Sequence, residues 1–451
     1  MKNRREFLAS MGALGAASFL MGPGAPSSRA AEDAKKLAIN GGTPVRQDRL
    51  GSSPYGPQFY DDAEKEGLIE VLESKSPFRW WGSKDSQCLQ FEKNYAKHIG
   101  VKHALGVTSG TTALFTAMGA LEVGPGDEVI LPAWTWYADY DAIVLAGALP
   151  VFVDVDASFN IDASKIEEKI TPRTKVIIAV HLQGTVADMD PILEIGRKHK
   201  IRVLEDCAQC LGGKYKGKYT GTMGDIAINS FQLSKSITSG EGGAVITNDD
   251  KLFERAIRFH DVGSLRSPYT EELGGGLLAS FAALNFRMNE FTGAVLKGQL
   301  LKLDKICSGL RKNAKKVRDG IADLPGIELR KTPDVEGDLG ACVFVDMKTR
   351  PKRDQFLRAL RAEGISAGGP GGSVILPVDG RIENKATVHP DWPTFNTPQG
   401  KAIQYGAASC AQTIDIIGRF GGVTMDPSFT DQDTDDIVEA IRKVYPVVAN
   451  A

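Results

Sequence analysis

One lysine, Lys235, lies in a stretch of small and hydroxyl-bearing residues that runs from Ser230 to Gly243 and reads SFQLSKSITSGEGG. An amine attacks an aldehyde only when it is unprotonated, and the ordinary lysine pKa of about 10.4 leaves almost none of it free at neutral pH. Glu241 is the only acid between Asp225 and Asp249. Little negative charge, together with cationic neighbours, would lower that pKa and make the amine a nucleophile. The stretch therefore predicts a Schiff-base lysine, with a surface lysine in a glycine-rich loop as the alternative.

An acidic residue, Asp206, lies at the end of a predicted strand, within the segment Leu204–Gln209. Facing a pyridinium nitrogen, its carboxylate would keep that nitrogen protonated through a charge-assisted hydrogen bond worth roughly 1.5–3 kcal/mol. A protonated ring of this kind accepts the electrons of a carbanion. The position therefore suits a pyridine-type cofactor, and a helix cap is the alternative role.

Two other segments suit a phosphate and a flat ring. Ser109–Leu114 lies where the apolar run Leu105–Val107 gives way to a helical pattern. Unpaired backbone N–H groups and the helix dipole make such an N-terminus an anion site, so Gly110 and Thr111 suit a phosphate. A helix cap without a ligand is the alternative. Trp136, at the end of another predicted strand, suits stacking on a heteroaromatic ring, with core packing as the alternative.

These features follow one another along the chain as a phosphate cradle, an aromatic side chain, a strand-end aspartate and a lysine. From about Leu37 to Asp304 the chain resembles the pyridoxal-phosphate aminotransferases of the DegT/StrS type, which act on keto-sugars and adopt fold type I. Segments 37–46 and 285–291 are most similar to the branch that contains aminohydroxybenzoate synthase and the scyllo-inosose aminotransferases. The stretches that carry the resemblance are Ser109–Leu114, Thr135–Trp136, His181–Gly184, Glu205–Gln209, Ser230–Phe231, Lys235, Gly240–Gly243 and Asn285–Met288.

The resemblance implies a role for each residue around the cofactor's ring. Lys235 forms the Schiff base with pyridoxal 5′-phosphate, and Asp206 meets the pyridine nitrogen. Gln209 contacts the side of the ring that carries the hydroxyl group, and Trp136 stacks on the ring. Lys235 and Asp206 are therefore the expected catalytic residues.

The resemblance also implies how the phosphate is held. Gly110, Thr111 and Ser230 bind it from one chain, and Asn285 joins them from the neighbouring subunit. The expected active unit is therefore a homodimer with a shared site. Ala283-Leu284 stands before Asn285 where the family commonly has glycine, so the shape of this loop departs from the family pattern.

The implied reaction moves an amino group from glutamate or glutamine to a keto-sugar or a cyclic polyol ketone in two half-reactions, with ping-pong kinetics. Lys235 moves the proton between the donor carbon and the cofactor. A ketodeoxysugar dehydratase of the same family carries histidine in place of this lysine, so Lys235 argues against that activity. The alternative from another class is a non-catalytic periplasmic binding or regulatory protein that retains the fold.

The elements that must position these residues alternate between strands and helices from Ala104 onward, which predicts an α/β fold with a mostly parallel sheet flanked by helices. Ligands of such sheets bind beyond the carboxyl ends of the strands, where the candidate residues fall. The predicted strands are Glu128–Leu131, Val151–Val155, Val176–His181, Arg202–Glu205, Ile226–Phe231 and Ala244–Thr247.

Two domains are expected after the first residues of the chain. The large cofactor-binding domain, with an N-terminal arm, spans residues 37–310, and a smaller α/β domain spans residues 311–451. Helical patterns cover 61–74 and 286–323, and the small domain contains a strand over Cys342–Met347 and a final helix over Asp431–Tyr445. The region 365–400, rich in glycine and proline, is predicted to be a long loop.

The composition narrows the range of partners. The chain has 451 residues, a formal charge of −2 and 42% hydrophobic residues, which describes a globular protein with no basic excess for nucleic acid or an anionic membrane. Six scattered cysteines exclude a dense disulfide scaffold. Cys207 and Cys210 form a Cys-x-x-Cys pair without a second pair to complete a zinc site, so no metal is expected and a redox role is the remaining alternative.

The first 31 residues differ from the rest. Asn3–Leu8 is a twin-arginine element, followed by a modest apolar run over Phe7–Met21 and a small-residue stretch that ends near Ala30-Ala31. This is the pattern of a bacterial twin-arginine signal peptide, which carries folded proteins with their cofactor. The expected location is therefore the periplasm, or the cytoplasm if the signal does not function.

Overall fold

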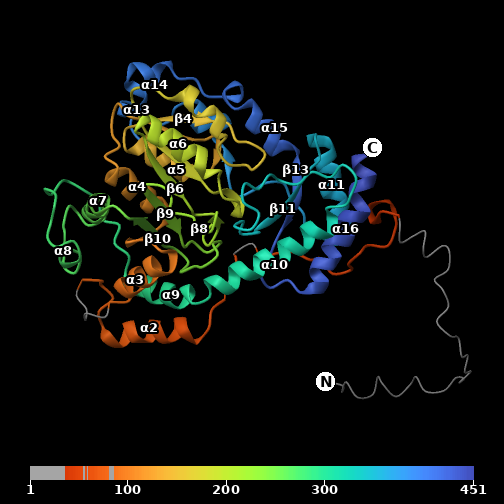
Figure 1. Cartoon of the computed structure of the whole chain (residues 1–451), viewed down its shortest axis with the longest axis horizontal. Helices are drawn as coiled ribbons and strands as arrows, with labels where there is room; N and C mark the ends of the chain where they lie inside the picture. Colours follow the sequence, from red (N-terminus) through yellow and green to blue (C-terminus); the bar gives the residue numbers. More distant parts are fainter. Residues whose placement is uncertain (1–35, 54–55, 58, 81–85, 451) are drawn as a thin grey trace, which may run out of the picture.

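A seven-stranded sheet forms the centre of the larger part of the molecule (Figure 1). The computed structural model describes residues 36–53, 56–57, 59–80 and 86–450, and the predicted signal peptide lies outside them. Five strands run parallel, and β10 is antiparallel to both of its neighbours. The predicted α/β class is therefore confirmed. In spatial order the strands are β1 (His103–Val107), β10 (Gly243–Thr247), β9 (Ile226–Ser230), β6 (Arg202–Asp206), β5 (Thr174–Val180), β2 (Glu128–Pro132) and β4 (Leu149–Val153).

The strands are buried on both faces, and alternate side chains enter two separate apolar cores. Ile177 belongs to one core, while its neighbours Val176 and Ile178 belong to the other. Such near-continuous apolar runs are typical of parallel strands covered by helices on both sides. One core includes side chains of α3 (Gln87–Ile99), α6 (Met189–His199) and α9 (Glu290–Leu300), and the other includes side chains of α4 (Gly110–Ala120), α5 (Tyr137–Leu145) and α7 (Asp250–His260).

A second, smaller sheet lies at the other end of the molecule (Figure 1). It pairs β11 (Cys342–Asp346) with β13 (Phe420–Thr424) in antiparallel register. The predicted strand and the predicted final helix are confirmed, although that helix continues to Ala449. The helices around this sheet are α10 (Leu303–Ile321), α11 (Arg350–Ala362), α15 (Ala411–Arg419) and α16 (Asp431–Ala449).

Helix α10 runs from the larger part of the molecule to the small sheet (Figure 1). The expected domain boundary between residues 310 and 311 falls within this helix, and the division into two domains stays a prediction. The predicted helical region 286–323 contains α9 and α10, but residues 286–289 are not helical. Asn289 caps α9 instead, because its side chain accepts a hydrogen bond from the backbone of Thr292.

The prediction of one long loop over 365–400 is wrong. Pro393 and Pro398 occupy the first turns of short helices, where proline's fixed φ favours a helix start rather than a loop. The side chain of Asp379 caps another short helix. The elements of this region are β12 (Val374–Ile375), which pairs with β3 (Trp134–Thr135), η5 (Leu376–Val378), α12 (Gly380–Glu383), α13 (Pro393–Asn396) and α14 (Pro398–Ala402).

The remaining elements are short, apart from α2. The predicted helix over 61–74 is confirmed as α2. It begins after Asp61 because Asp61 and Glu64 form a capping box there. These elements are η1 (Ala38–Asn40), α2 (Asp62–Ser74), η2 (Ala163–Lys165), η3 (Glu167–Lys169), η4 (Leu182–Gly184), β7 (Lys214–Tyr215), β8 (Lys218–Tyr219), α8 (Tyr269–Glu272) and η6 (Ala407–Ser409).

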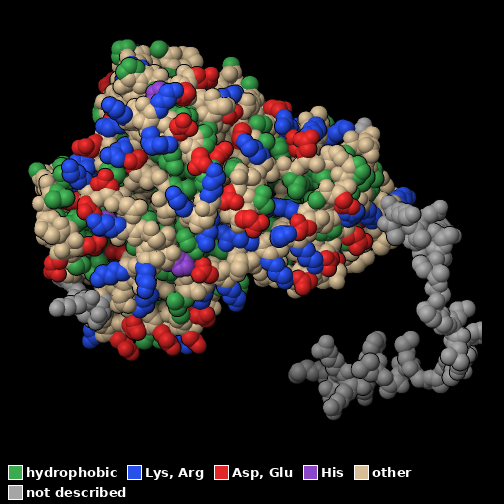
Figure 2. All heavy atoms as spheres, viewed as in Figure 1, with side chains coloured by type: hydrophobic (Ala, Val, Ile, Leu, Met, Phe, Trp, Pro, Cys, Tyr) green, Lys and Arg blue, Asp and Glu red, His purple; other side chains and the backbone are tan. Residues whose placement is uncertain are grey.

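The surface carries acidic and basic side chains interspersed on the face shown in Figure 2. This mixed pattern matches the near-zero formal charge of the chain. Of the helices in the described residues, none combines the length and the apolar character needed to cross a bilayer.

Candidate active site

A cavity of about 820 Å³ lies beyond the carboxyl ends of the parallel strands. Its wall includes the strand ends of the large sheet, the end of β13 with the following residues 425–427, the arm around Ser52 and Gly56, and the glycines of 369–372. Seven of the eight predicted site residues line this one cavity, which are Gly110, Thr111, Trp136, Asp206, Gln209, Ser230 and Lys235. The eighth, Asn285, does not line it within this chain.

The N-terminus of α4 forms the predicted phosphate cradle. Ser109 and Thr112 form a capping box, so Ser109 satisfies the Thr112 amide. Helix geometry leaves the amides of Gly110 and Thr111 without an acceptor inside the helix, and the helix dipole favours an anion there. A Cβ on Gly110 would lie 2.7 Å from the Cβ of Ser230. The close approach of α4 to β9 therefore requires glycine, and it brings the Ser230 side chain to the same place.

Asp206 ends β6 and is buried. No helix begins after it, because residues 207–213 form turns. Its Oδ1 instead accepts a hydrogen bond of 2.8 Å from the backbone N–H of Ala208. The alternative role as a helix cap is therefore wrong. Burial raises the pKa of Asp206, although the Ala208 amide and the positive charge of Lys235 act in the opposite direction.

Lys235 lies in the loop between β9 and β10, and its side chain enters the cavity rather than the solvent. The alternative of a surface lysine is therefore wrong. Burial lowers the pKa of Lys235, and the negative charge of Asp206 opposes that shift. The predicted cause, cationic neighbours, is thus corrected to desolvation. Among the described residues, no acceptor forms a hydrogen bond or ion pair with its Nζ, so the amine is available for chemistry.

Two nearby tryptophans, Trp134 and Trp136, differ in how deeply they are buried. Trp134 on β3 is the buried core residue, packed edge-on against Phe159. Trp136 precedes α5, is 51% exposed and lines the cavity. Core packing is therefore not the role of Trp136, and its position agrees with the predicted stacking on a ring.

Gln209 forms hydrogen bonds with Gln183 and with the loop 371–373. Its Nε2 donates to the Ser373 hydroxyl at 3.0 Å and to the Gly372 carbonyl at 3.2 Å. Its Oε1 accepts from the backbone N–H of Gln183, whose side chain donates to Gly371. Gln183 belongs to the His181–Gly184 stretch of the family resemblance, which predicted no role for it. Together the two glutamines hold the loop 371–373 over the cavity.

Asn285 is exposed at the surface of the chain. Its backbone bridges to Asp261, and its side-chain oxygen accepts from the Arg287 amide. Leu284, which stands where the family commonly has glycine, is held by backbone hydrogen bonds to Phe259 and Val262. The contribution of Asn285 to a neighbouring subunit's site stays a prediction.

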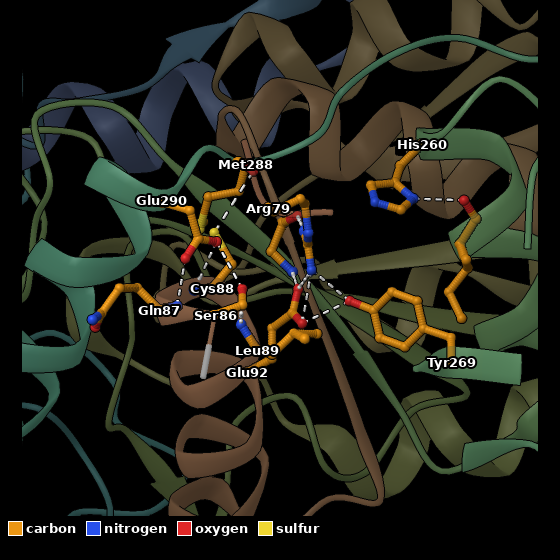
Figure 3. A network of polar contacts seen from close by, with 12 residues as sticks. Arg79, Ser86, Gln87, Cys88, Leu89, Glu92, His260, Tyr269, Met288 and Glu290 are labelled. Carbon is orange, nitrogen blue, oxygen red and sulfur yellow. Dashed lines mark hydrogen bonds and ion pairs between the residues drawn. The ribbon is translucent and has the colours of Figure 1, made fainter. Parts of the chain in front are cut away.

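A buried polar network supports the strand that leads into the phosphate cradle (Figure 3). Arg79 pairs with Glu92 at 2.7 Å and donates to the carbonyl of Gly106 in β1, while Glu92 accepts from the Gly106 amide. Tyr269 also contacts both charged groups. Trp80 packs edge-on against Tyr269.

Cys207 and Cys210, the Cys-x-x-Cys pair, are both buried, and burial raises the pKa of each thiol. Cys207 lies near His181 and Glu205 in an arrangement that resembles a metal site. However, His181 bonds Glu205 through Nε2 and accepts the Ala187 amide on Nδ1. Glu205 also accepts from three backbone amides. These hydrogen bonds engage the potential ligand atoms of His181 and Glu205, which favours a structural role for the pair.

The fold and cavity define a class: an α/β enzyme with a reactive lysine, a strand-end carboxylate and a helix N-terminus for a phosphate. The chain matches the model of the DegT/DnrJ/EryC1/StrS aminotransferase family over residues 60–369 and belongs to that family. The family is pyridoxal-phosphate-dependent, so pyridoxal phosphate is the cofactor, and the glycine-lined cradle and the buried carboxylate fit it.

Relatives span several sugar and cyclitol activities. GDP-perosamine synthase of Caulobacter vibrioides is 41% identical over 54% of this chain and 63% of its own length. L-Glutamine:2-deoxy-scyllo-inosose aminotransferase of Micromonospora echinospora is 36% identical over 80% of this chain and 83% of its own length. The solved structure of 3-amino-5-hydroxybenzoic acid synthase has a TM-score of 0.73 and 28% identity, covering 89% of this chain and all of that one. The resemblance to this branch is confirmed at the level of the family.

Proposed function

We propose that the protein transfers an amino group from glutamate or glutamine to a keto-sugar or a cyclic polyol ketone. The observation that carries this proposal is Lys235, a half-buried lysine of lowered pKa that lines the cavity and whose amine has no partner among the described residues. Two relatives are named for a sugar-nucleotide synthase and for a glutamine-dependent cyclitol aminotransferase, which supports an acceptor of the sugar or cyclitol class.

When bound, the cofactor supplies an aldehyde for amines and a pyridinium ring that accepts electrons. Lys235 would provide the uncharged amine and would carry the proton to and from the donor carbon. Asp206 would keep the ring nitrogen protonated. Gly110, Thr111 and Ser230 would hold the phosphate, and Trp136 would stack on the ring. Gln209 would contact the side of the ring that carries the hydroxyl group.

Two activities compete with this proposal. The family's dehydratases use histidine at the lysine position, and Lys235 argues against them. A non-catalytic binding protein would keep the cavity without turnover. The test is a screen of the purified protein with glutamate and glutamine as donors and with keto-sugars and inososes as acceptors, following 2-oxo acid release. Release of a 2-oxo acid that requires both a donor and an acceptor supports the proposal. If no donor–acceptor pair gives release, the proposal is contradicted.

We also propose that the active unit is a homodimer in which Asn285 completes the partner's phosphate site. The exposed position of Asn285 outside its own chain's cavity supports this arrangement. The test mixes inactive Lys235→Ala with inactive Asn285→Ala subunits. Because half of randomly mixed dimers are hybrid and each hybrid has one intact site, about a quarter of wild-type activity should return. No recovery on mixing would contradict the shared site.

Export through the twin-arginine pathway is part of the proposal, supported by the Arg4-Arg5 element. In the periplasm a free sugar, an inositol-like ketone or a wall component is a better acceptor than a nucleotide-sugar. Fusion of residues 1–40 to a reporter that functions only after export tests this, with Arg4→Lys/Arg5→Lys as the matched control. Signal from the fusion that disappears in the control supports export.

A further inference from the structure

A second buried carboxyl group, Asp139, lies in the first turn of α5 and is fully inaccessible to solvent. One of its oxygens, Oδ2, accepts a hydrogen bond of 2.5 Å from the hydroxyl of Thr135. The other oxygen, Oδ1, is also buried and has no donor among the described residues. A buried oxygen without a donor costs free energy unless something supplies a proton.

The Asp139 carboxyl lies within hydrogen-bond reach of Asp206. Two ionised carboxylates that lie this close together would repel each other strongly, because both groups are buried away from water. A single proton between them replaces the repulsion with a hydrogen bond and also satisfies Oδ1. The two residues come from different elements, α5 and β6, so the contact depends on the fold and not on sequence neighbours.

The surrounding charges decide which of the two groups keeps the negative charge. Lys235, from the loop after β9, and His181, after β5, both favour the ionised form of Asp206. Asp206 also accepts the amide of Ala208. Asp139 has only the Thr135 hydroxyl, and burial followed by the charge of Asp206 raises its pKa well above the usual range. The proton therefore belongs on Asp139.

We propose that Asp139 is a positioning residue whose protonated carboxyl group donates a hydrogen bond to Asp206 and thereby fixes its orientation and its charge. This rests on the proposed role of Asp206 at the cofactor's ring nitrogen. In that role, Asp139 donates a hydrogen bond to the carboxylate that holds the ring proton. It touches neither the cofactor nor the substrate.

The first test uses the apoprotein, so it needs no cofactor. Asp139→Asn keeps an acceptor for Thr135 and a donor for Asp206 but cannot titrate. Asp48→Asn is the matched control, because Asp48 is exposed and no hydrogen bond or ion pair involves its carboxylate among the described residues. Urea unfolding of the variants and the wild type is measured from about pH 5 to about pH 7, above the unfolded aspartate pKa of about 3.9.

The sign of the expected result follows from proton counting. The folded wild type keeps a proton on Asp139 that the unfolded chain has lost, so its stability falls as the pH rises through this range. Relative to Asp139→Asn, its folding equilibrium constant should fall about tenfold per pH unit. Asp48→Asn should keep the wild-type slope. A ratio of wild type to Asp139→Asn that does not change with pH would overturn the proposal.

The second test uses the protein loaded with pyridoxal phosphate and follows its absorption against pH and its affinity for the cofactor. Asp139→Asn should keep the wild-type spectrum, whereas Asp139→Leu, which cannot donate, should bind the cofactor about tenfold more weakly, the loss of one charge-assisted hydrogen bond. Equal behaviour of the two variants would overturn the proposal. Absence of any cofactor band in the wild type would instead overturn the role of Asp206, and the apoprotein slope would still be present.

Discussion

Two buried groups of charged side chains in this protein differ in how completely they are paired. In the network of Figure 3, Arg79, Glu92 and Tyr269 contact one another, and backbone groups of β1 take further hydrogen bonds. In the cavity, Lys235 has no partner for its Nζ among the described residues, and Asp206 shares its surroundings with a second acid. The first group holds the fold, and the second keeps groups available for a ligand.

The difference indicates how charged groups that stabilise the fold can be distinguished from charged groups that take part in chemistry. A network in which both charges have a partner stabilises the segment before the phosphate cradle, since removing one partner leaves a charge without compensation. An incompletely paired group has a shifted pKa and free hydrogen-bonding capacity, which catalytic sites use. Substitutions in the two groups should therefore have opposite effects on stability and on turnover.

The largest expected effect is loss of turnover in Lys235→Ala. Removal of the amine takes away both the covalent link and the proton carrier, so kcat should fall by at least about 10⁴-fold. The apoprotein should unfold at the same urea concentration as the wild type or a higher one, because a half-buried amine without a partner among the described residues has been removed. Steady-state kinetics and urea titrations measure the two effects, and substantial turnover would contradict the assignment.

The next effect is a slower reaction in Asp206→Ala, because the ring nitrogen loses its counter-charge and the electron sink weakens. We expect kcat to fall by about 10²–10³-fold, in line with the loss of one strong charge-assisted interaction at a catalytic centre. Single-turnover measurements of the donor half-reaction isolate this step. A wild-type rate would show that the carboxylate does not serve the ring.

Substitution in the paired network should reverse the pattern. Glu92→Gln leaves the Arg79 guanidinium buried without a negative partner, so stability should fall by about 3–5 kcal/mol. The turnover of the molecules that remain folded should stay near the wild-type value, since Glu92 does not line the cavity. Urea unfolding with kinetics at low temperature separates the two quantities. Equal stability together with lost turnover would place Glu92 in the site instead.

A smaller effect is expected from Gly110→Ala. The added Cβ would lie 2.7 Å from Ser230, closer than real contacts allow, so α4 must shift away from β9. We expect the affinity for pyridoxal phosphate to fall about tenfold, which is about 1.4 kcal/mol, with a small change in stability. Gly124→Ala, at an open position, is the matched control. Equilibrium titration with the cofactor measures the difference.

The sequence predicted the strands and most of the site because both follow local rules. Buried parallel strands are apolar runs, so their positions were right to within a few residues, and the candidate residues fell at their carboxyl ends. The sequence did not reveal the helices of 365–400, because Pro393 and Pro398 start helices in a composition that indicates a loop.

Properties that depend on three-dimensional packing were beyond the sequence. The cause of the lowered pKa of Lys235 was expected to be cationic neighbours, but the structure assigns it to burial. Asp139 stands four residues after Thr135, yet its proximity to Asp206 on β6 has no signal in the sequence. The same holds for Gln183, whose contacts with Gln209 and the 371–373 loop arise only in the folded chain.

The most direct test of the central claim is the visible absorption of the purified protein, followed by borohydride reduction and peptide mapping. We expect a band near about 410–430 nm that borohydride converts into a stable pyridoxyl adduct on Lys235. The peptide that contains Ser230–Gly243 should carry the added mass, and the Lys235→Ala protein should carry none. No band after addition of pyridoxal phosphate, or an adduct on another lysine, would contradict the account.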